Sequence, residues 1–204
     1  EGDLTKVITS GHVKELREKT GAPMMDCKQA LQEAKGDFDR AIELLRKKGI
    51  ASAAKKMGRI ALEGLIYSYI HGEGRIGVLV EVNCETDFVA RTEAFQGFVK
   101  NIALHIAASA PLYVSEVDVP QDLVNKEREI YKHQAAEAKK PPAVIEKIVD
   151  GKLEKFYDEV CLLRQPYIKD PDKKVSDLLR ELISQIGENC SIRRFVRYQL
   201  GEKK

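Results

Sequence analysis

The sequence predicts an α+β protein, with a small three-helix domain at its N-terminus and an antiparallel sheet in a larger core. Apolar residues recur at helical spacing through residues 12–49, and the period changes to that of strands from Gly64 onward. Helices and strands then follow one another without a regular β-α-β repeat. These two observations favour a mixed fold over a doubly wound one.

Composition and charge are those of a folded globular chain. The 204 residues suffice for one or two domains, and 43% are hydrophobic and 32% charged. No apolar run approaches the roughly 18 residues that a membrane span needs. The 34 basic and 32 acidic side chains are interspersed and leave a net charge of +2, without the clustered basic face of a nucleic-acid binder. We therefore expect neither a membrane nor a nucleic acid as a direct partner.

The four cysteines lie far apart and form no C-x-x-C pair. This spacing argues against a zinc site and against a disulfide framework. We expect small, buried, reduced side chains, as in a cytoplasm or an organelle matrix. No signal peptide is recognisable, and the first residue is Glu rather than Met, which we interpret as processing or trimming. The cysteines are Cys27, Cys84, Cys161 and Cys190.

Residues 1–50 predict a domain of three short helices. Ser10 can cap the first helix, and Gly21 ends it. Pro23 suits the first turn of the second helix, and Gly36 suits its C-terminal cap. A bundle this small has a thin core, so we expect it to need a neighbouring or partner surface.

The third helix leads into a linker. Asp37 can cap this helix, and apolar residues follow at i, i+3, i+4 and i+7 before Gly49 ends it. The basic, Ala-rich residues beyond it predict a short separate helix within a linker at 51–63. Residues 64–204 would then form the α+β core.

Two strand-like stretches, "LIYSYIH" and "IGVLVEVN", open the core and are joined by the tight turn "GEGR". The glycines from Gly72 to Gly77 also match G-x-G-x-x-G. In a dinucleotide site, however, these glycines lie between a strand and a helix, so that the pyrophosphate meets the helix N-terminus. Strands flank both sides here, which favours a hairpin turn. We expect no nucleotide cofactor.

The rest of the core predicts helices, a loop and a closing strand. Gly151 could interrupt the long helical stretch in the middle of this region. The predicted elements are an apolar-faced helix from near Thr92, a charged helix from Pro120 to about Lys140, helical "AVIEKIVDGKLEKFYDEVCLL", a loop "RQPYIKDPDKK", a helix that Gly187 ends, and a strand "CSIRRFVRYQL".

An enzyme active site is not predicted. The histidines lie in separate elements without the i, i+4 spacing of metal ligands, so we expect no metal. His105, between two apolar residues of a helix, is interpreted as a packed or surface imidazole. Cys84 paired with a histidine remains open as a nucleophile, with only composition in its favour. Glu85 and Asp87 alternate on an extended segment and should point to opposite sides, which disfavours a paired acid and base.

The stretch "VNCETDFVAR" places an acid, Asp87, and a large ring, Phe88, at a strand-to-helix corner. Corners usually use Gly, Asn, Asp or Ser. In a purely structural interpretation, Phe88 covers the core while Thr86 or Asp87 caps the next helix. Adjacent methionines at the start of the second helix cannot both face one core, so at least one is available for an adaptable protein contact.

Two long motifs resemble the signatures of translation elongation factor Ts of bacteria and organelles. The first lies between Leu16 and Leu31 and contains "TGA" and "MMDCK"; the second, Glu81–Arg91, matches throughout. The likeness continues through "AAKKMGR", "GEN" and "SIRRFVRYQLGE", so it covers nearly the whole chain. Two long motifs in the right order are far more specific than a lone glycine pattern.

The resemblance implies a ubiquitin-associated-like (UBA-like) N-terminal domain and a non-enzymatic activity, the acceleration of GDP release from the GTPase elongation factor Tu. Asp87 and Phe88 would enter the partner near its magnesium and phosphate site, supported by Thr86 and Val89. The ring would wedge between helices of the partner, so that the metal leaves and the phosphate loop loosens. Further implied contacts are Arg17, Met24 and Met25 in the N-terminal domain, Lys56 in the linker, and Ile186, Gly187 and Asn189 in the core.

The chain departs from the family pattern in several ways. Pro23 stands where the family commonly has Gly, which a first-turn position tolerates. The chain carries one core module where longer relatives have two, and we expect it to lack their protruding coiled-coil insertion. Short relatives pair two chains, so we expect a homodimer in a two-plus-two complex, through the terminal strand around Cys190, whose edge would otherwise be open. Cys190 could cross-link the pair, but a buried or free thiol is favoured.

A rival hypothesis is a helical-bundle adaptor that binds another protein or RNA without exchange activity. Salt-sensitive RNA binding, or binding by residues 1–50 alone, would favour it. The expected location is a bacterial cytoplasm, or an organelle matrix if the N-terminus is a processed transit site.

Overall fold

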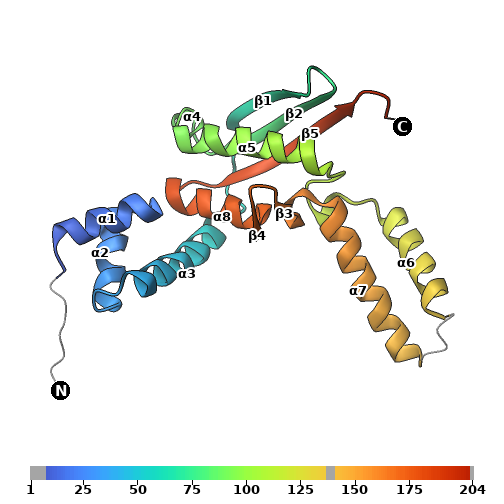
Figure 1. Cartoon of the computed structure of the whole chain (residues 1–204), viewed down its shortest axis with the longest axis horizontal. Coiled ribbons are helices and arrows are strands. Elements are labelled where there is room, and N and C mark those ends of the chain that lie inside the picture. Colours follow the sequence, from blue (N-terminus) through green and yellow to red (C-terminus); the bar gives the residue numbers. More distant parts are fainter. Residues whose placement is uncertain (1–7, 137–140, 203–204) are drawn as a thin grey trace. The chain divides into compact units, whose positions relative to one another are not determined.

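The computed structural model describes residues 8–136 and 141–202 (Figure 1). It combines helices with antiparallel sheet, which confirms the α+β class. Contacts divide the chain into two units. The first gathers Glu1–Gly64, Asn83–Gln96 and Leu178–Ser191, and the second gathers Leu65–Val82, Gly97–Asp177 and Ile192–Lys204. Domain boundaries at residues 50 and 63 stay a prediction.

Three helices open the first unit, as predicted: α1 (Ser10–Thr20), α2 (Met24–Glu33) and α3 (Phe38–Lys56). Their inward faces form a small core, because apolar residues recur along each helix at helical spacing. The buried residues of this core are Val13, Leu16, Cys27, Ala30, Leu31, Ala34, Ala41 and Leu45.

The helix ends differ from the predictions by one or two residues. Thr9, with an extended backbone, caps α1 by accepting a hydrogen bond from the His12 backbone N–H, so Ser10 is already helical. Pro23 precedes α2 in the N-cap position. Ala34 is the C-cap of α2, and Gly36 closes the turn two residues later by donating its N–H to the Leu31 carbonyl at 2.9 Å. The predicted ends at Gly21 and Asp37 are confirmed.

Helix α3 does not end at Gly49, and no separate linker helix follows it. A methyl group at Gly49 would lie 2.6 Å from Ser184 Oγ, so the glycine allows a close approach of α3 to another segment of the same unit. The prediction of a helix end at Gly49 is wrong because the glycine serves packing rather than termination.

The larger sheet contains β1 (Glu63–His71), β2 (Ile76–Cys84) and β5 (Cys190–Gln199), in the order β1-β2-β5. Helix α5 (Glu93–Ser109) runs along it (Figure 1). The inner face of the sheet buries Val78, Val80 and Val82, and the facing side of α5 buries Phe98, Val99, Ile102 and Ile106. The glycine-rich segment is a tight turn between β1 and β2, as predicted, with the Arg75 N–H donating to the His71 carbonyl at 3.1 Å.

Helices α6 (Gln121–Ala136) and α7 (Pro142–Val160) form an antiparallel hairpin (Figure 1). Val124, Val149 and Leu153 are buried between them, and Arg128 pairs with Asp150 at 3.0 Å. That the chain lacks the coiled-coil insertion of longer relatives stays a prediction, because a two-helix hairpin does not by itself identify that insertion. The two helices are rich in charged residues, and the apolar residues buried between them form a narrow stripe. Helix α7 also continues through Gly151, and the predicted end of α6 near Lys140 lies outside the described residues.

The predicted loop at residues 164–174 contains a small antiparallel hairpin of β3 (Pro166–Tyr167) and β4 (Asp170–Lys174). Strand β4 consists of one proline and four charged residues, a composition untypical of strands, but a short turn aligns it with β3. Helix α8 (Val175–Ile186) follows, and Gly187, with φ 81°, ends it as predicted. In the described part of the chain, no helix combines the length and apolarity needed to cross a membrane.

Replacing Gly151 by Ala should stabilise α7. A methyl group there meets nothing within 4 Å, and alanine in an exposed helix interior is favoured over glycine by about 0.5–1 kcal/mol. Thermal unfolding followed by circular dichroism should show a higher midpoint for Gly151→Ala. The matched control Gly187→Ala should lower it, because φ is positive there. A lower midpoint for Gly151→Ala would contradict the uninterrupted helix.

Candidate functional site

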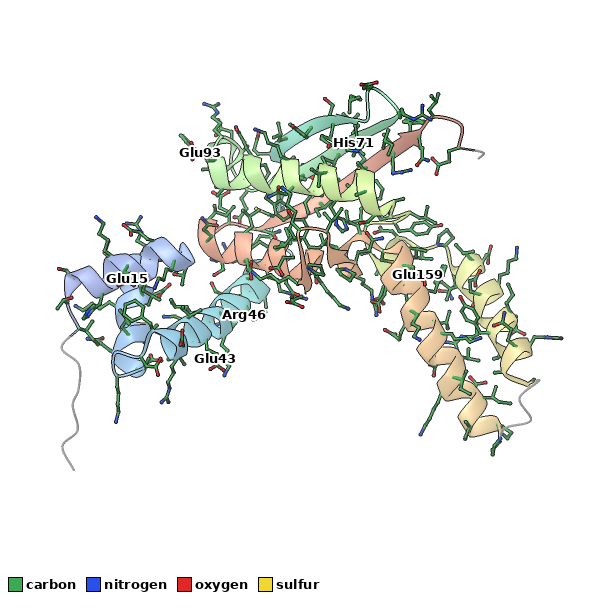
Figure 2. The ribbon with its side chains drawn as sticks, in the orientation of Figure 1. Glu15, Glu43, Arg46, His71, Glu93 and Glu159 are labelled. Carbon is green, nitrogen blue, oxygen red and sulfur yellow. The ribbon has the colours of Figure 1, made fainter. Side chains whose placement is uncertain are left out.

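The corner after β2 is built around a single helical turn, α4 (Asp87–Ala90). Thr86 precedes it with φ −129° and ψ 154°, and its hydroxyl oxygen accepts a hydrogen bond from the Val89 N–H at 3.5 Å. Thr86 is therefore the N-cap, one of the two residues predicted for this role. Helix α5 begins three residues later, at Glu93, which Figure 2 labels.

Adjacent side chains of α4 face opposite environments. Val89 is 8% exposed and anchors the turn in the protein, whereas Phe88 is 78% exposed. The structural interpretation in which Phe88 covers its own core is therefore wrong. The corner holds an aromatic ring in water, next to a side chain that fixes the backbone.

Two acids of the corner have separate partners. Asp87 pairs with Arg91 one turn later at 2.7 Å, and its side chain is about half exposed. Glu85 accepts a hydrogen bond from the Asn189 N–H at 2.6 Å and lies 3.6 Å from the Arg59 guanidinium. The expectation that Glu85 and Asp87 do not act as a pair agrees with these contacts.

Glu188 holds the corner from a distant part of the sequence. One of its carboxylate oxygens accepts the Thr86 N–H at 3.0 Å, and the other accepts the Thr86 hydroxyl at 2.7 Å. Sequence reasoning did not single out Glu188, although it lies in the "GEN" stretch that carries part of the resemblance. The turn at Gly187 brings Glu188 to the corner, because the positive φ of Gly187 reverses the chain after α8.

The other candidates of the core differ in exposure. Asn189 is only 6% exposed, and its side-chain amide donates to the Arg59 carbonyl at 2.7 Å. Gly187 is exposed and Ile186 half-buried. A methyl group at Gly187 would lie 3.9 Å from Lys56 Nζ, so the structure brings these two candidates together.

Candidates in the N-terminal helices lie on the surface. Arg17 is exposed near the end of α1, and Met24 and Met25, at the start of α2, are 46% and 71% exposed. Flexible, polarizable methionine side chains suit adaptable protein contacts. Both methionines, rather than at least one, are available for such a contact.

All four cysteines are free and buried, as expected. Burial, together with the negative charge of Glu188, raises the pKa of Cys84 to about 11. Burial and the neighbouring Cys84 and Glu188 raise the pKa of Cys190 to about 12. Because the thiolate is the nucleophilic form, these surroundings disfavour Cys84 as a nucleophile. Its thiol instead donates to the Thr86 carbonyl at 3.1 Å.

His105 is a packed imidazole in the second unit. Its Nδ1 accepts the Ile168 N–H at 3.2 Å, so Nε2 carries the proton and donates to Gln165 Oε1 at 2.9 Å. Burial lowers the pKa of His105. Among the residues described, no three His, Cys, Asp or Glu side chains are grouped to hold a metal ion.

Comparison with known proteins places these features in a family. A family model described as "Elongation factor TS" matches residues 9–202. The chain belongs to the elongation factor Ts family. The protein named elongation factor Ts from Carboxydothermus hydrogenoformans is 63% identical over 196 residues, which cover 96% of this chain and 90% of that relative. The one from Caldanaerobacter subterraneus subsp. tengcongensis is 61% identical over 196 residues, 96% of this chain and 98% of the relative.

The family match includes every candidate residue from Arg17 to Asn189. The resemblance inferred from the two motifs is thereby confirmed. The contacts assigned to individual residues stay predictions.

Proposed function

We propose that this protein is a guanine nucleotide exchange factor that promotes GDP release from elongation factor Tu during translation elongation. Family membership supplies the partner class, and the exposed ring of Phe88 is the observation that carries the mechanism. The rival hypothesis, an adaptor without exchange activity, has no support in the comparisons.

An exchange factor must bind the nucleotide-free partner more tightly than the GDP-bound one. Linkage then requires GDP to weaken the factor by the same ratio. A surface with equal affinity for both states would shift nothing. The factor therefore needs a group that fits only a distorted nucleotide site. The Phe88 ring suits this role, since burying an aromatic side chain removes about 150–250 Å² from water.

Asp87 would act beside the ring. A carboxylate brought next to a magnesium and phosphate site disturbs the charge balance and hydrogen bonds that hold both. In the free factor the charge of Asp87 is balanced by Arg91 at 2.7 Å. Because Arg91 is itself largely exposed, the pair can separate when the partner approaches.

The remaining contacts would dock the factor. We propose that Arg17, Met24 and Met25 bind the same GTPase. Lys56 and Gly187, which lie close together, would form a second contact with it, and Ile186 would lie at the edge of that second contact. Asn189 is buried and hydrogen-bonded to Arg59 and Glu85, so we propose that it supports the corner rather than contacting the partner. We further propose a bacterial cytoplasmic setting, because the relatives named above are bacterial.

A homodimer is proposed because one face of the larger sheet is apolar and exposed. A methyl group at Gly77 would lie 3.5 Å from Ile70 Cδ1, and Arg194 pairs with Glu81 at 2.7 Å, so these contacts lie on one face of the sheet. Every second residue along each strand points to that same face. The exposed apolar members of this face are Ile66, Ile70, Leu79, Val196 and Tyr198. A second copy is the proposed cover, which would give a two-plus-two complex with the GTPase.

The dimer would not depend on a disulfide. Strand β5 lies at the edge of the sheet, as predicted, but Cys190 is only 2% exposed. A cross-link through its sulfur would require the strand to move, so we assign the association to the apolar face.

Replacing Phe88 by Ala should lower factor-stimulated release of fluorescent GDP more than about tenfold, because truncating a central aromatic contact commonly costs 2 kcal/mol or more. The matched control is Leu112→Ala, which also removes an exposed apolar side chain and should leave release unchanged. Circular dichroism should show both variants folded. Full stimulation by a folded Phe88→Ala protein would refute the wedge.

Replacing Ile70 and Leu79 together by Lys should convert the dimer to a monomer, because the charges would be buried in an apolar interface. Sedimentation equilibrium at micromolar concentration measures this. Val117→Lys serves as the control, since Val117 is exposed outside the sheet. A monomeric parent protein, or a double variant that remains dimeric, would exclude the proposed face.

A further inference from the structure

The corner at Thr86 and the turn after α8 bind each other reciprocally. Thr86 donates its N–H and its hydroxyl to the two carboxylate oxygens of Glu188, at 3.0 and 2.7 Å. The next residue, Asn189, donates its N–H to Glu85 at 2.6 Å. Each segment thus supplies a carboxylate for a backbone N–H of the other, although 102 residues separate Thr86 from Glu188.

This arrangement replaces an interaction that α4 cannot make alone. In a capping box, a Glu or Gln at the third helical position accepts the N–H of the N-cap residue. The third position of α4 is Val89, which is buried and cannot accept a hydrogen bond. Glu188 supplies the missing carboxylate from outside, and Val89 remains free to anchor the turn.

A four-residue helix needs such outside support. Forming one helical turn fixes several backbone dihedrals for a single hydrogen bond, so an isolated turn is unstable in water. Rotation about the Thr86 backbone would redirect the ring two residues later. The two bonds from Thr86 to a half-buried carboxylate oppose this rotation.

We propose that Glu188 is a positioning residue for nucleotide exchange: its carboxylate fixes Thr86 so that α4 presents Asp87 and Phe88 in one orientation. This inference rests on the proposed exchange function of the corner. Glu188 acts through Thr86 and needs no contact with the GTPase.

We call the two hydrogen bonds from Thr86 to the Glu188 carboxylate the clamp. Its chemistry distinguishes Glu from Gln at position 188. An ionised carboxylate accepts at both oxygens, whereas an amide accepts at one oxygen and presents N–H groups at its other end. Glu188→Gln keeps the size of the side chain but removes its charge. The amide oxygen can accept the Thr86 N–H and the amide nitrogen can donate to the Thr86 hydroxyl, so both charge-assisted bonds become weaker neutral ones.

The test is the rate of fluorescent GDP release from elongation factor Tu with the factor in excess. Glu188→Gln should lower the plateau rate about tenfold, since it replaces two hydrogen bonds to a charged acceptor by weaker neutral ones. A variant that is merely partly unfolded would need more protein to reach an unchanged plateau. The control Glu129→Gln removes a charge from an exposed site on α6 and should keep the parent plateau.

Variants of Thr86 test the same clamp from the other side. Thr86→Ser keeps both donors and should lower the plateau less than Thr86→Val, which loses the hydroxyl. The double variant Thr86→Val with Glu188→Gln should be no slower than the slower single variant, because the two residues act as one unit. Multiplied losses in the double variant would overturn the proposal.

The parent protein and Phe88→Ala, measured in the same assay, distinguish a failure of the proposed exchange function from a failure of the positioning role of Glu188. If the parent does not accelerate GDP release, the proposed function fails. If the parent does and Phe88→Ala does not, a parent-like plateau for Glu188→Gln overturns the positioning role and leaves the exchange function standing.

Discussion

The bond between the Glu188 carboxylate and Thr86 is the interaction on which the candidate site depends. It closes the N-terminal end of α4, while Val89 is buried and its carbonyl accepts the Thr92 hydroxyl at 2.8 Å. The same hydroxyl oxygen accepts the Phe95 N–H at 3.3 Å and so starts α5. The backbone is thus fixed on both sides of the exposed Phe88 ring.

An exposed phenylalanine contributes little to the stability of the free chain, because its apolar surface remains hydrated. The role proposed for the ring is in binding. A ring held on a fixed backbone loses less conformational freedom when it enters a partner than one on a mobile loop. The exposed methionines of α2 would make a different kind of contact, since unbranched side chains can adapt to the surface that they meet.

Local patterns predicted much of the fold. Strand alternation and the "GEGR" turn identified β1 and β2, and the caps at Asp37 and Gly187 were found from residue type. The wrong helix end at Gly49 has a long-range cause, because this glycine serves a contact with Ser184. At the site, Thr86 was recognisable as a cap. The partner of its N–H lies 102 residues away, where no local pattern reveals it.

Whether Phe88 distinguishes the nucleotide states of the GTPase is measured most directly by calorimetric titration. The parent protein and Phe88→Ala are each titrated into nucleotide-free and GDP-bound elongation factor Tu. A wedge predicts that the substitution weakens binding to the nucleotide-free form more than about tenfold and binding to the GDP-bound form less than about twofold. Equal weakening of both would contradict it, because the ring would then only add adhesion.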